Sequence, residues 1–435
     1  MIRKNKILFY LILGFLVFNS CKKELLEQNT NSTFSTYDAY KPVDHKMNEN
    51  GLFFIDQIKD IDSNDYATVF GFNTEGKLNF KTTRLISDFI DEPDTYFDIR
   101  INELFVGEKV FAIGDAKQNT STYMIICEID QINGQILSKK TVLVTQDAPS
   151  SQYFSDLVKT SYGYKLFHFG EYGIVNILKM TKTDNDFNII DEEELLMGTA
   201  FASQEIIYND AIITPNDELV VCYWGPLASK PSFIVHCINS DYTSKWIQTY
   251  TADFSDTDPD YNRNRELMWF NDEILLFSYG FFSGTVDGAL TTTTTPCIYN
   301  INPNTGLTDS YHLVPGKFVN TEGQDVTFDT DNLLTARAFN NQEIIISGYV
   351  TNQNIYSGAM VHLDADFTVK NKFYLGDTRP ISRFHYVGIN NEGDYIGCGY
   401  TPRFSNGTFI DPDMSIDALS VFVGNYNSEG KLNFE

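Results

Sequence analysis

Short apolar runs separated by polar turns dominate the chain from residue 48 onward. Val, Ile, Tyr, Phe and Thr gather in these runs, Asn, Asp and Gly interrupt them, and almost no stretch has a helical period. This pattern predicts β-strands joined by turns. One unit recurs, a polar turn followed by an almost wholly apolar strand, which predicts strands buried on both faces. Its copies begin at Val110, Leu219, Ile274, Ile344 and Tyr395, with a weaker copy at Lys165.

A second recurring unit is a pair of alternating strands joined by a turn that contains Gly, Asn or Asp. It spans residues 66–80, 123–137, 174–190, 233–247, 298–313, 360–374 and 419–434, so each copy starts about 50 to 65 residues after the last. One such unit cannot cover its own apolar faces and must stack on its neighbours. The two units together predict radially repeated four-stranded sheets, an all-β fold of the β-propeller type.

The two ends of the predicted propeller carry nearly the same hairpin. Residues 73–80 read NTEGKLNF and residues 427–434 read NSEGKLNF. Such similarity is expected where the first and last blades meet and hide their edges. The hairpins predict seven blades. Six or eight stay open, because the interval from Tyr279 to Ile344 is long and the first unit lacks a clear leading strand; a pair of β-sandwiches is the alternative fold.

The N-terminus has the order of a secretory leader. Arg3, Lys4 and Lys6 form a positive segment, and residues 7–18 form an apolar core too short to span a bilayer. Ser20 and Cys21 then resemble the cleavage site of bacterial lipoprotein signals, in which the new first cysteine is lipidated on its thiol and acylated on its amine. The resemblance implies lipidation at Cys21. An ordinary secretory signal and a start-anchor helix are the alternatives.

Residues 21–47 are rich in Asn, Ser, Thr, Lys and Glu and have no apolar periodicity, which predicts a flexible tether. The segment from Cys21 to Glu24 resembles the start of mature outer-membrane lipoproteins of the Bacteroidetes type. This implies an outer-membrane location and leaves the periplasmic and cell-surface faces open. The sequence thus divides into a lipoprotein signal at 1–20, a lipidated tether at 21–47 and a β-propeller at 48–435.

Two turns resemble those of known propeller families. Residues 299–306 are similar to the Thr-Gly hairpins of quinoprotein-like and YVTN-like propellers, but the tryptophan that normally follows in quinoproteins is missing, so their cofactor is not implied. Residues 239–246 resemble a sialidase Asp-box that keeps Asp241 and Trp246 and lacks the central glycine. Asp-boxes are structural turns, so this resemblance implies no sialidase activity.

The charge of the chain excludes one class of partner. The chain has 32 basic and 58 acidic residues; removal of residues 1–20 takes away Arg3, Lys4 and Lys6, so the mature form stands at 29 − 58 = −29. Nucleic acid would be repelled, because its binding depends on Lys and Arg that replace condensed counterions. The acidic composition suits cations, neutral glycans or basic protein surfaces.

Aromatic residues gather near strand ends and form one candidate site. They are Tyr223, Trp224, Trp269, Phe270, Tyr279, Phe281 and Phe282, with Tyr349 and Tyr400 at matching places in later units. Residues repeated in sequence lie on one side of a propeller, so exposed rings there would form a belt around its mouth and stack on sugars or fill a protein pocket. The alternative is that the rings pack between blades.

A second candidate is a calcium site. Asp253, Asp256, Asp258 and Asp260 lie within one short loop and offer the oxygen ligands that Ca²⁺ prefers, although the loop lacks the glycine and glutamate of an EF-hand. A solvated acidic loop is the alternative. Apart from Cys21, five cysteines lie in apolar runs without CxxC spacing, which predicts buried thiols; a bridge between Cys222 and Cys237 is the alternative.

No catalytic constellation stands out. The six histidines have no metal-site spacing, the nucleophile-elbow and phosphate-loop patterns are absent, and acidic pairs are too numerous for one to be singled out. We therefore predict a binding or scaffold module in the cell envelope, anchored by lipid, with a glycan or an outer-membrane protein as partner and no cofactor other than calcium. The alternatives are a propeller enzyme that acts on polysaccharide and a structural subunit of an outer-membrane assembly.

Overall fold

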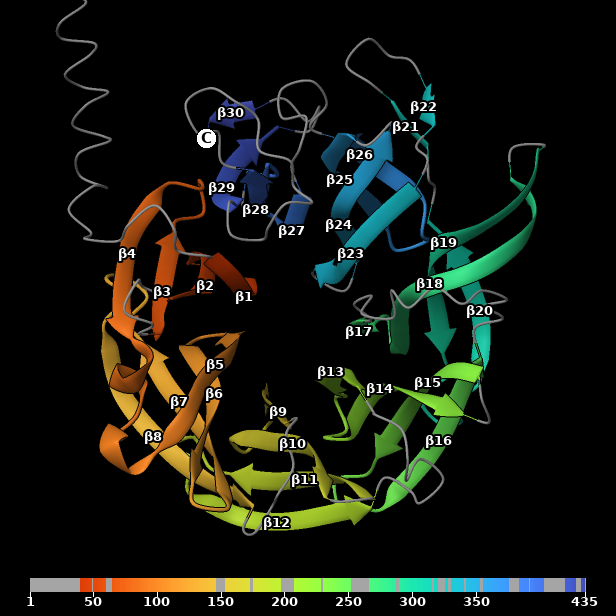
Figure 1. Cartoon of the computed structure of the whole chain (residues 1–435). Helices are drawn as coiled ribbons and strands as arrows, with labels where there is room; N and C mark the ends of the chain where they lie inside the picture. Colours follow the sequence, from red (N-terminus) through yellow and green to blue (C-terminus); the bar gives the residue numbers. More distant parts are fainter. Residues whose placement is uncertain are drawn as a thin grey trace, which may run out of the picture.

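A ring of β-sheets surrounds a central axis (Figure 1). The computed structural model describes residues 40–48, 50–59, 65–145, 153–172, 175–196, 207–227, 230–251, 266–286, 289–314, 317–319, 325–327, 330–339, 342–352, 355–374, 383–390, 392–402, 419–427 and 432–434. Within these residues, no helix has the length and apolar character needed to cross a bilayer. Two short 3₁₀ helices, η1 (Ile86–Phe89) and η2 (Pro93–Thr95), connect the first two sheets.

Seven four-stranded antiparallel sheets form the blades, which confirms the β-propeller and its seven-blade count. Blades 1 to 4 consist of β1 (Tyr40–Asn48), β2 (Gly51–Lys59), β3 (Asp65–Phe72) and β4 (Leu78–Leu85); β5 (Phe97–Val106), β6 (Val110–Gln118), β7 (Ser121–Ile129) and β8 (Ile136–Thr145); β9 (Tyr153–Lys159), β10 (Tyr164–Tyr172), β11 (Val175–Thr183) and β12 (Ile189–Leu196); and β13 (Ile207–Ile213), β14 (Leu219–Leu227), β15 (Lys230–Ile238) and β16 (Ser244–Thr251). Blades 5 to 7 consist of β17 (Glu266–Phe270), β18 (Glu273–Val286), β19 (Ala289–Ile301) and β20 (Thr308–Leu313); β23 (Thr330–Phe339), β24 (Glu343–Asn352), β25 (Ile355–Asp364) and β26 (Val369–Tyr374); and β27 (Arg383–Ile389), β28 (Tyr395–Pro402), β29 (Leu419–Tyr426) and β30 (Leu432–Phe434).

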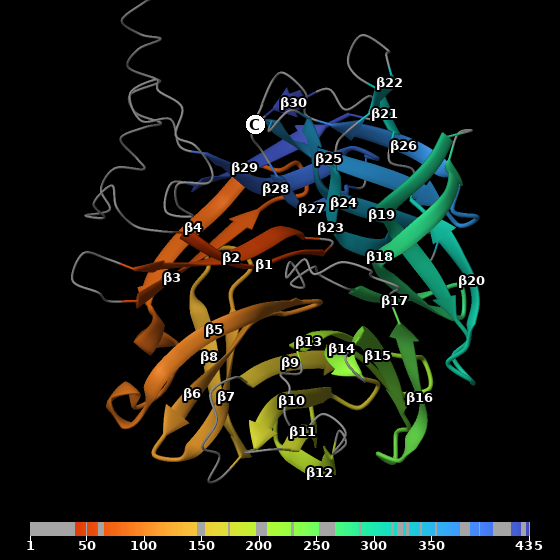
Figure 2. The ribbon, with the colours of Figure 1, turned by 45° about the vertical axis from the view of Figure 1, so that its right-hand side comes forward.

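Each blade is a meander whose first strand faces the axis and whose fourth strand lies outermost (Figures 1 and 2). The apolar unit of the sequence is the second strand of a blade, and the alternating unit is the hairpin of the third and fourth strands. The long interval between Tyr279 and Ile344 holds the extended β18–β19 hairpin and a separate two-stranded ribbon of β21 (Lys317–Val319) and β22 (Asp325–Thr327). These insertions, rather than an eighth blade, account for its length.

The first blade begins earlier than the sequence predicted. Strand β1 occupies Tyr40–Asn48, and all but its last residue lie in the range 21–47 that we assigned to the tether, so the propeller starts at Tyr40 rather than at residue 48. The missing leading strand of the first unit is β2, which pairs with β1 from Leu52 to Ile58. The sequence of β1 is polar and lacks the apolar pattern of a strand, because an innermost strand borders the axis rather than the space between blades.

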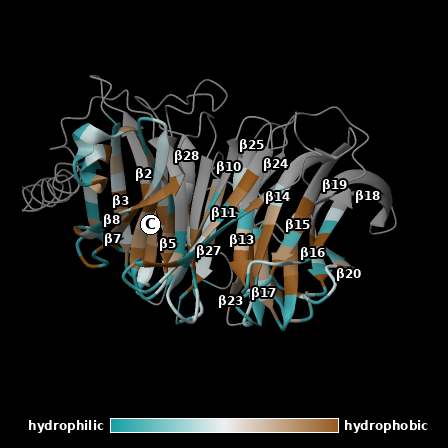
Figure 3. Cartoon of the chain, turned by 90° about the horizontal axis from the view of Figure 1, so that it is seen from below, coloured by the Kyte–Doolittle hydropathy of each residue, from teal (hydrophilic) through white to brown (hydrophobic). Residues whose placement is uncertain are grey.

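The hydrophobic core lies between the blades. Among the described residues, seven clusters of buried side chains occur, one at each interface between neighbouring blades. Successive side chains of the second strand point to opposite faces of the blade and so pack in two different interfaces. Phe53 of β2 packs toward blade 2, and its neighbour Phe54 packs toward blade 7. Figure 3 shows hydrophobic residues along these strands and hydrophilic residues at the turns along one edge of the disc.

An Asn or Asp side chain shapes the turn of the outer hairpin in blades 1 to 6, where this turn lies within the described residues. In blade 1, Asn73 Oδ1 accepts hydrogen bonds from the backbone N–H groups of Glu75 (3.0 Å) and Lys77 (2.9 Å). The same bonds to the second and fourth following N–H groups are made by Asp184 and Asp364. These side chains satisfy backbone groups that a tight turn leaves without partners, which is why Asn and Asp punctuate the sequence at hairpin intervals.

These turns also dock on the preceding blade. Trp246 in β16 is buried, and its indole N–H donates to Pro303 O in the β19–β20 turn of blade 5 at 2.9 Å. Gly306 in that turn has φ +70°, and a Cβ there would lie 2.4 Å from the Trp246 ring. Asp241 accepts from Thr243 N–H and thereby caps the β15–β16 turn. The Asp-box-like segment is therefore a structural turn, as its resemblance implied.

Side-chain contacts close the ring. Among the described strands, each of blades 1 and 7 consists of one contiguous segment, and none of these strands is exchanged between the two blades. Phe54 stacks on Phe70 with ring centroids 4.4 Å apart, and both belong to a cluster with Tyr386 and Ile396 of blade 7. Asn425 of β29 also donates to the Glu75 carbonyl at 3.1 Å. The two similar end hairpins, of which residues 428–431 lie outside the described part, therefore belong to blades that meet at this seam.

The seam can be tested with two equal truncations. We expect F54A and F53A each to lower the free energy of unfolding by about 3–5 kcal/mol, because each removes a fully buried phenyl ring. Hydrogen exchange should separate them. F54A should accelerate exchange in β2 and β28, and F53A should accelerate it in β2 and β6. Identical exchange maps for the two variants would contradict closure by packing between blades 1 and 7.

Candidate functional site

One register position of the innermost strands carries an acid in five consecutive blades. This position lies opposite Ile55, Ile113, Phe167, Cys222 and Phe277 of the second strands in blades 1 to 5. The residues there are Asp44, Glu103, Asp156, Asp210 and Glu266, followed by Thr335 in blade 6 and Tyr386 in blade 7. A register shift directly precedes the position in five of the seven inner strands, blades 3 and 5 excepted. A bulge there re-aims the residue that follows it.

Two of these acids hold neighbouring blades together. Asp210 Oδ2 accepts the backbone N–H of Leu267 at 2.7 Å, and Glu266 Oε2 accepts that of Ala336 at 2.6 Å. In each case the acid accepts a hydrogen bond from the next blade. The donor is the backbone N–H of the residue that follows the same register position there. Charge-assisted bonds of this kind satisfy buried backbone donors that interblade packing leaves without a ladder partner. The repetition of this position assigns these acids a structural role.

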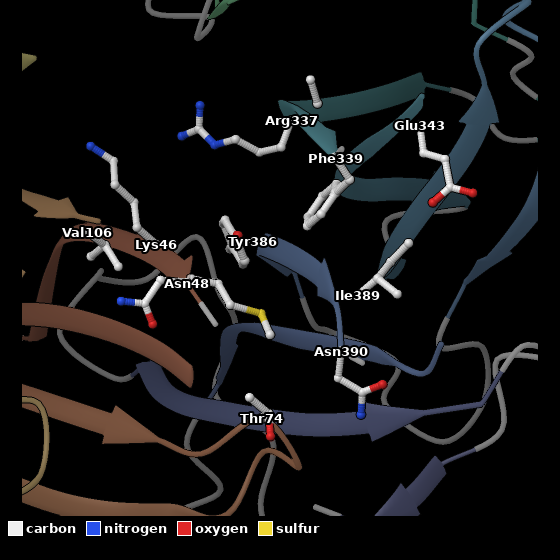
Figure 4. A pocket seen from close by; sticks show the side chains of 12 residues that line it. Lys46, Asn48, Thr74, Val106, Arg337, Phe339, Glu343, Tyr386, Ile389 and Asn390 are labelled. Carbon is white, nitrogen blue, oxygen red and sulfur yellow. The ribbon is translucent and has the colours of Figure 1, made fainter. Parts of the chain in front are cut away.

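A cavity of about 750 Å³ lies where blades 6, 7 and 1 meet near the axis. We call it the axial cavity. Its lining comes from four blades and from the β3–β4 turn, and it adjoins the two blades in which Thr335 and Tyr386 replace the acid. The lining residues are Lys46, Met47, Asn48, Thr74, Val106, Arg337, Ala338, Phe339, Glu343, Tyr386, Ile389 and Asn390 (Figure 4).

Two basic residues reach into the axial cavity from equivalent places. Lys46 in β1 and Arg337 in β23 both lie two residues beyond the acid position, opposite Phe53 and Ile345. Blade 7 has Gly388 at this place, where an added Cβ would lie 2.6 Å from Met47 Sδ. At this register position, blade 6 therefore has Arg337, blade 7 has a glycine and blade 1 has Lys46.

An acid fixes each cation, a half-buried one for Lys46 and a buried one for Arg337. Lys46 Nζ lies 2.5 Å from Glu103 Oε1, and Arg337 Nη1 lies 3.3 Å from Glu266 Oε2. The two acids expose 14% and 9% of their side chains, and the two bases 26% and 31%, so the acids anchor the bases from inside. Removal of one partner would leave a charge buried alone, which is costly. Neither Glu103 nor Glu266 lines the cavity, so a ligand meets the cationic side of each pair.

The opposite wall of the cavity holds Glu343, which lies beyond Phe339 (Figure 4). Glu343 forms an ion pair with Lys370, and its Oε2 lies 3.6 Å from His362 Nε2. His362 Nδ1 in turn hydrogen-bonds to the Tyr395 hydroxyl at 2.8 Å, across the interface of blades 6 and 7. Burial lowers the pKa of His362, which favours the neutral ring. This network ties Glu343 to the blade interface.

The axial cavity combines polar donors with apolar walls. Burial raises the pKa of Tyr386, which therefore stays a phenol at neutral pH. The Asn48 amide donates to Gly107 O at 2.6 Å and so belongs to the frame of the site. Val106, Phe339 and Ile389 supply apolar surface. Concave sites of this size with a few convergent polar groups are suited to ligand binding. In the described ranges, no three His, Cys, Asp or Glu side chains gather as a metal site.

The aromatic residues singled out in the sequence fall into two groups. Trp224, Tyr279, Tyr349 and Tyr400 occupy the same register position of the second strand, five residues beyond its first buried residue, in blades 4 to 7. Tyr223 is 2% exposed and packs between blades 3 and 4, so it follows the packing alternative. Trp269 lies beside the β17–β18 turn, at the other end of the blade from Tyr279. It is half-buried and packs on the cluster between blades 4 and 5.

Phe281 and Phe282 lie on the long β18–β19 hairpin, opposite Thr294 and Thr293. This hairpin stays paired as far as Val286 and Ala289, well beyond the partners of β17 and β20. The acidic loop with Asp253, Asp256, Asp258 and Asp260 lies outside the described residues, between the ends of β16 and β17. Cys21 lies outside them as well. The five later cysteines are buried free thiols, and burial raises the pKa of Cys237 to about 12.

Sequence reasoning missed the axial cavity and its two cations. Lys46 lay in the segment assigned to the tether, and Arg337 lay just before the apolar strand that begins at Ile344. The available signal was an acid shortly before the apolar unit in the first five copies, and a base two residues beyond the equivalent position in the first and sixth copies. That signal depends on an alignment of inner strands whose bulges shift the spacing by one residue.

No protein-family model matches the chain, and no curated protein matches it. Solved structures with a similar arrangement include the β-propeller domain of the Trilobed protease from Pyrococcus furiosus, at 10% identity and a TM-score of 0.43, with 85% of this chain and 91% of that chain covered. They also include a levansucrase variant of B. megaterium (8% identity, TM-score 0.39, 67% and 86% covered) and an apocarotenoid oxygenase variant of Synechocystis (11%, 0.40, 90% and 87%). Such values concern the fold and say nothing about activity.

Two buried histidines should make stability depend on pH. Burial lowers the pKa of His168 to about 3 and that of His236 to about 4, below the value of about 6.5 in an unfolded chain. The unfolded state therefore binds protons first, and stability should fall as the pH drops below about 6.5, by about 1.4 kcal/mol per pH unit for each histidine. Urea unfolding between pH 7 and pH 5 measures this slope. H236Q should reduce it by one histidine's share, and an unchanged slope would contradict the assignment.

Proposed function

We propose that the mature protein is a lipid-anchored β-propeller that acts as a binding or scaffold module for a glycan or protein partner in the cell envelope. The observation that carries this proposal is the axial cavity. Four blades contribute to its lining, and Glu103 and Glu266 hold its cations in place before any ligand arrives. Preorganised polar groups within a concave, partly apolar site favour binding because little order must be created on association.

The anchoring half of the proposal rests on the leader-like N-terminus, the Ser20-Cys21 junction and the polar residues that follow. Residues 22–39 separate Cys21 from the start of β1. Because Tyr40 begins the innermost strand of blade 1, a tether that ends there joins the ring at its axial strand.

Lipidation at Cys21 can be tested directly. In a bacterial host with lipoprotein processing, the wild-type protein should incorporate labelled palmitate and sediment with membranes. C21S should lose both properties, because serine cannot receive the thioether-linked lipid. C297S, which alters a buried thiol of blade 5, should keep the label. Labelled C21S protein would contradict the proposed anchor.

Binding at the axial cavity can be tested by filling it. T74W places a large ring into the cavity from the β3–β4 turn and leaves all charged residues intact. L137W adds the same ring at a position of β8 that is 58% exposed, far from the cavity, and serves as the control. On a glycan library and in affinity purification from native membranes, T74W should lose the ligand that wild type and L137W retain. Equal retention by all three proteins would contradict the proposed site.

A further inference from the structure

The cationic side of the axial cavity indicates what kind of ligand it takes. Among the twelve described residues that line it, Lys46 and Arg337 are cations and Glu343 is the one acid, and in Figure 4 the two cationic head groups lie on the same side, away from Glu343. We infer that the axial cavity binds the carboxylate of an acidic sugar residue between Arg337 and Lys46. This inference rests on the proposed binding function and names the class of its ligand.

The two cations have the donor capacity for this task. A guanidinium carries five N–H donors in one plane, so Arg337 can hold Glu266 through Nη1 and a second carboxylate along another edge. An ammonium carries three donors, so Lys46 can bind Glu103 and a ligand oxygen together. Glu266 Oε2 also accepts the Ala336 N–H, which fixes the acid and hence the orientation of the arginine. Both cations are therefore aimed before the ligand binds.

Glu343, the acid among the described lining residues, lies where its repulsion of a bound carboxylate is weak. Glu343 is bound by Lys370, which does not line the cavity, and it faces His362. Its charge is thus compensated from behind, and Phe339 separates it from the two cations (Figure 4). A carboxylate at the cationic side would therefore lie nearest to the N–H donors of Lys46 and Arg337, whose charges Glu103 and Glu266 partly compensate from behind, and would meet a screened repulsion from Glu343.

The remaining walls fit a sugar ring. Phe339, Ile389 and Val106 give apolar surface for the C–H face of a pyranose, and Thr74 and Asn390 give polar groups for its hydroxyls. The volume of about 750 Å³ also exceeds what one small anion needs. A saccharide that carries a carboxylate uses the cations, the apolar walls and the hydroxyl partners together. A bare anion would use the cations alone.

The test compares one saccharide in two forms. Trigalacturonate and its carboxyl-reduced derivative, in which each carboxylate has become a primary alcohol, are titrated into the full-length mature protein by calorimetry. We expect the acid form to bind roughly ten- to a hundredfold more tightly, because a hydrogen bond between charged groups is lost on reduction. Its affinity should also weaken as salt is raised. Equal affinity for the two forms, or no binding of trigalacturonate, would overturn the inference.

Neutralised pairs locate the site without leaving a lone buried charge. In E266Q/R337Q, the glutamine oxygen can still accept the Ala336 N–H, so the fold is preserved while the cation is removed. This variant should lose the preference for the acid form. K109Q/E128Q removes an ion pair of 3.1 Å at the rim of blade 2 and should keep it. R337K should retain part of it, since lysine keeps the charge without the planar donors. Thermal unfolding of each variant checks that it is folded.

The outcomes separate this inference from the proposed function. If the carboxyl-reduced saccharide binds as well as trigalacturonate and T74W abolishes both, the binding function stands and the carboxylate assignment fails. If triglutamate binds as tightly as trigalacturonate, the ligand is not a sugar and the inference fails. If T74W leaves trigalacturonate binding unchanged, the axial cavity is not the site, and both fail.

Discussion

Every blade of this protein depends on its two neighbours for a hydrophobic interior. A single four-stranded sheet has two apolar faces and nothing of its own to cover them, so the side chains of each second strand must alternate between two interfaces. Phe53 and Phe54 show the arrangement at its simplest, since adjacent residues serve different interfaces. Because the dependence runs from blade to blade around the ring, it is satisfied only when the last blade meets the first. Ring closure is therefore a requirement of burial, and the seam at Phe54, Phe70 and Tyr386 meets it without an exchanged strand.

The centre of the ring follows a different rule. Inner strands converge at the axis, where there is less room for apolar packing and where backbone N–H groups at bulges need acceptors. Acids at one register position supply them, as Asp210 and Glu266 do for the following blades. Where Thr335 and Tyr386 break this series, the ring opens into the axial cavity. Glu266, which joins blades 5 and 6, also orients Arg337, and Glu103 at the same register position orients Lys46, so the scaffold and the site share residues.

The sequence predicted the fold well and the site poorly, for a physical reason. Second strands and outer hairpins carry strong local signals: uninterrupted apolar runs such as that from Leu219, and turns capped by Asn or Asp such as Asn73. Both signals are set by burial or by a turn, so they repeat with little variation. Inner strands border the axis, so they mix polar with apolar residues, and their register shifts at bulges. For this reason β1 was assigned to the tether, and Lys46 and Arg337 were not recognised as a pair.

Contiguous blades, and the contact between the first and the last of them, have a consequence for the design of variants. The step from β30 in the outer layer of blade 7 to β1 at the axis of blade 1 has the same form as the steps that already link consecutive blades. A circular permutant, with the old termini joined by a linker and new termini cut between two other blades, would keep every strand pairing. It would convert the present seam into an ordinary interface and give another pair of blades the task of closing the circle. The blade at which the chain begins can thus be changed while the arrangement of blades around the ring stays the same.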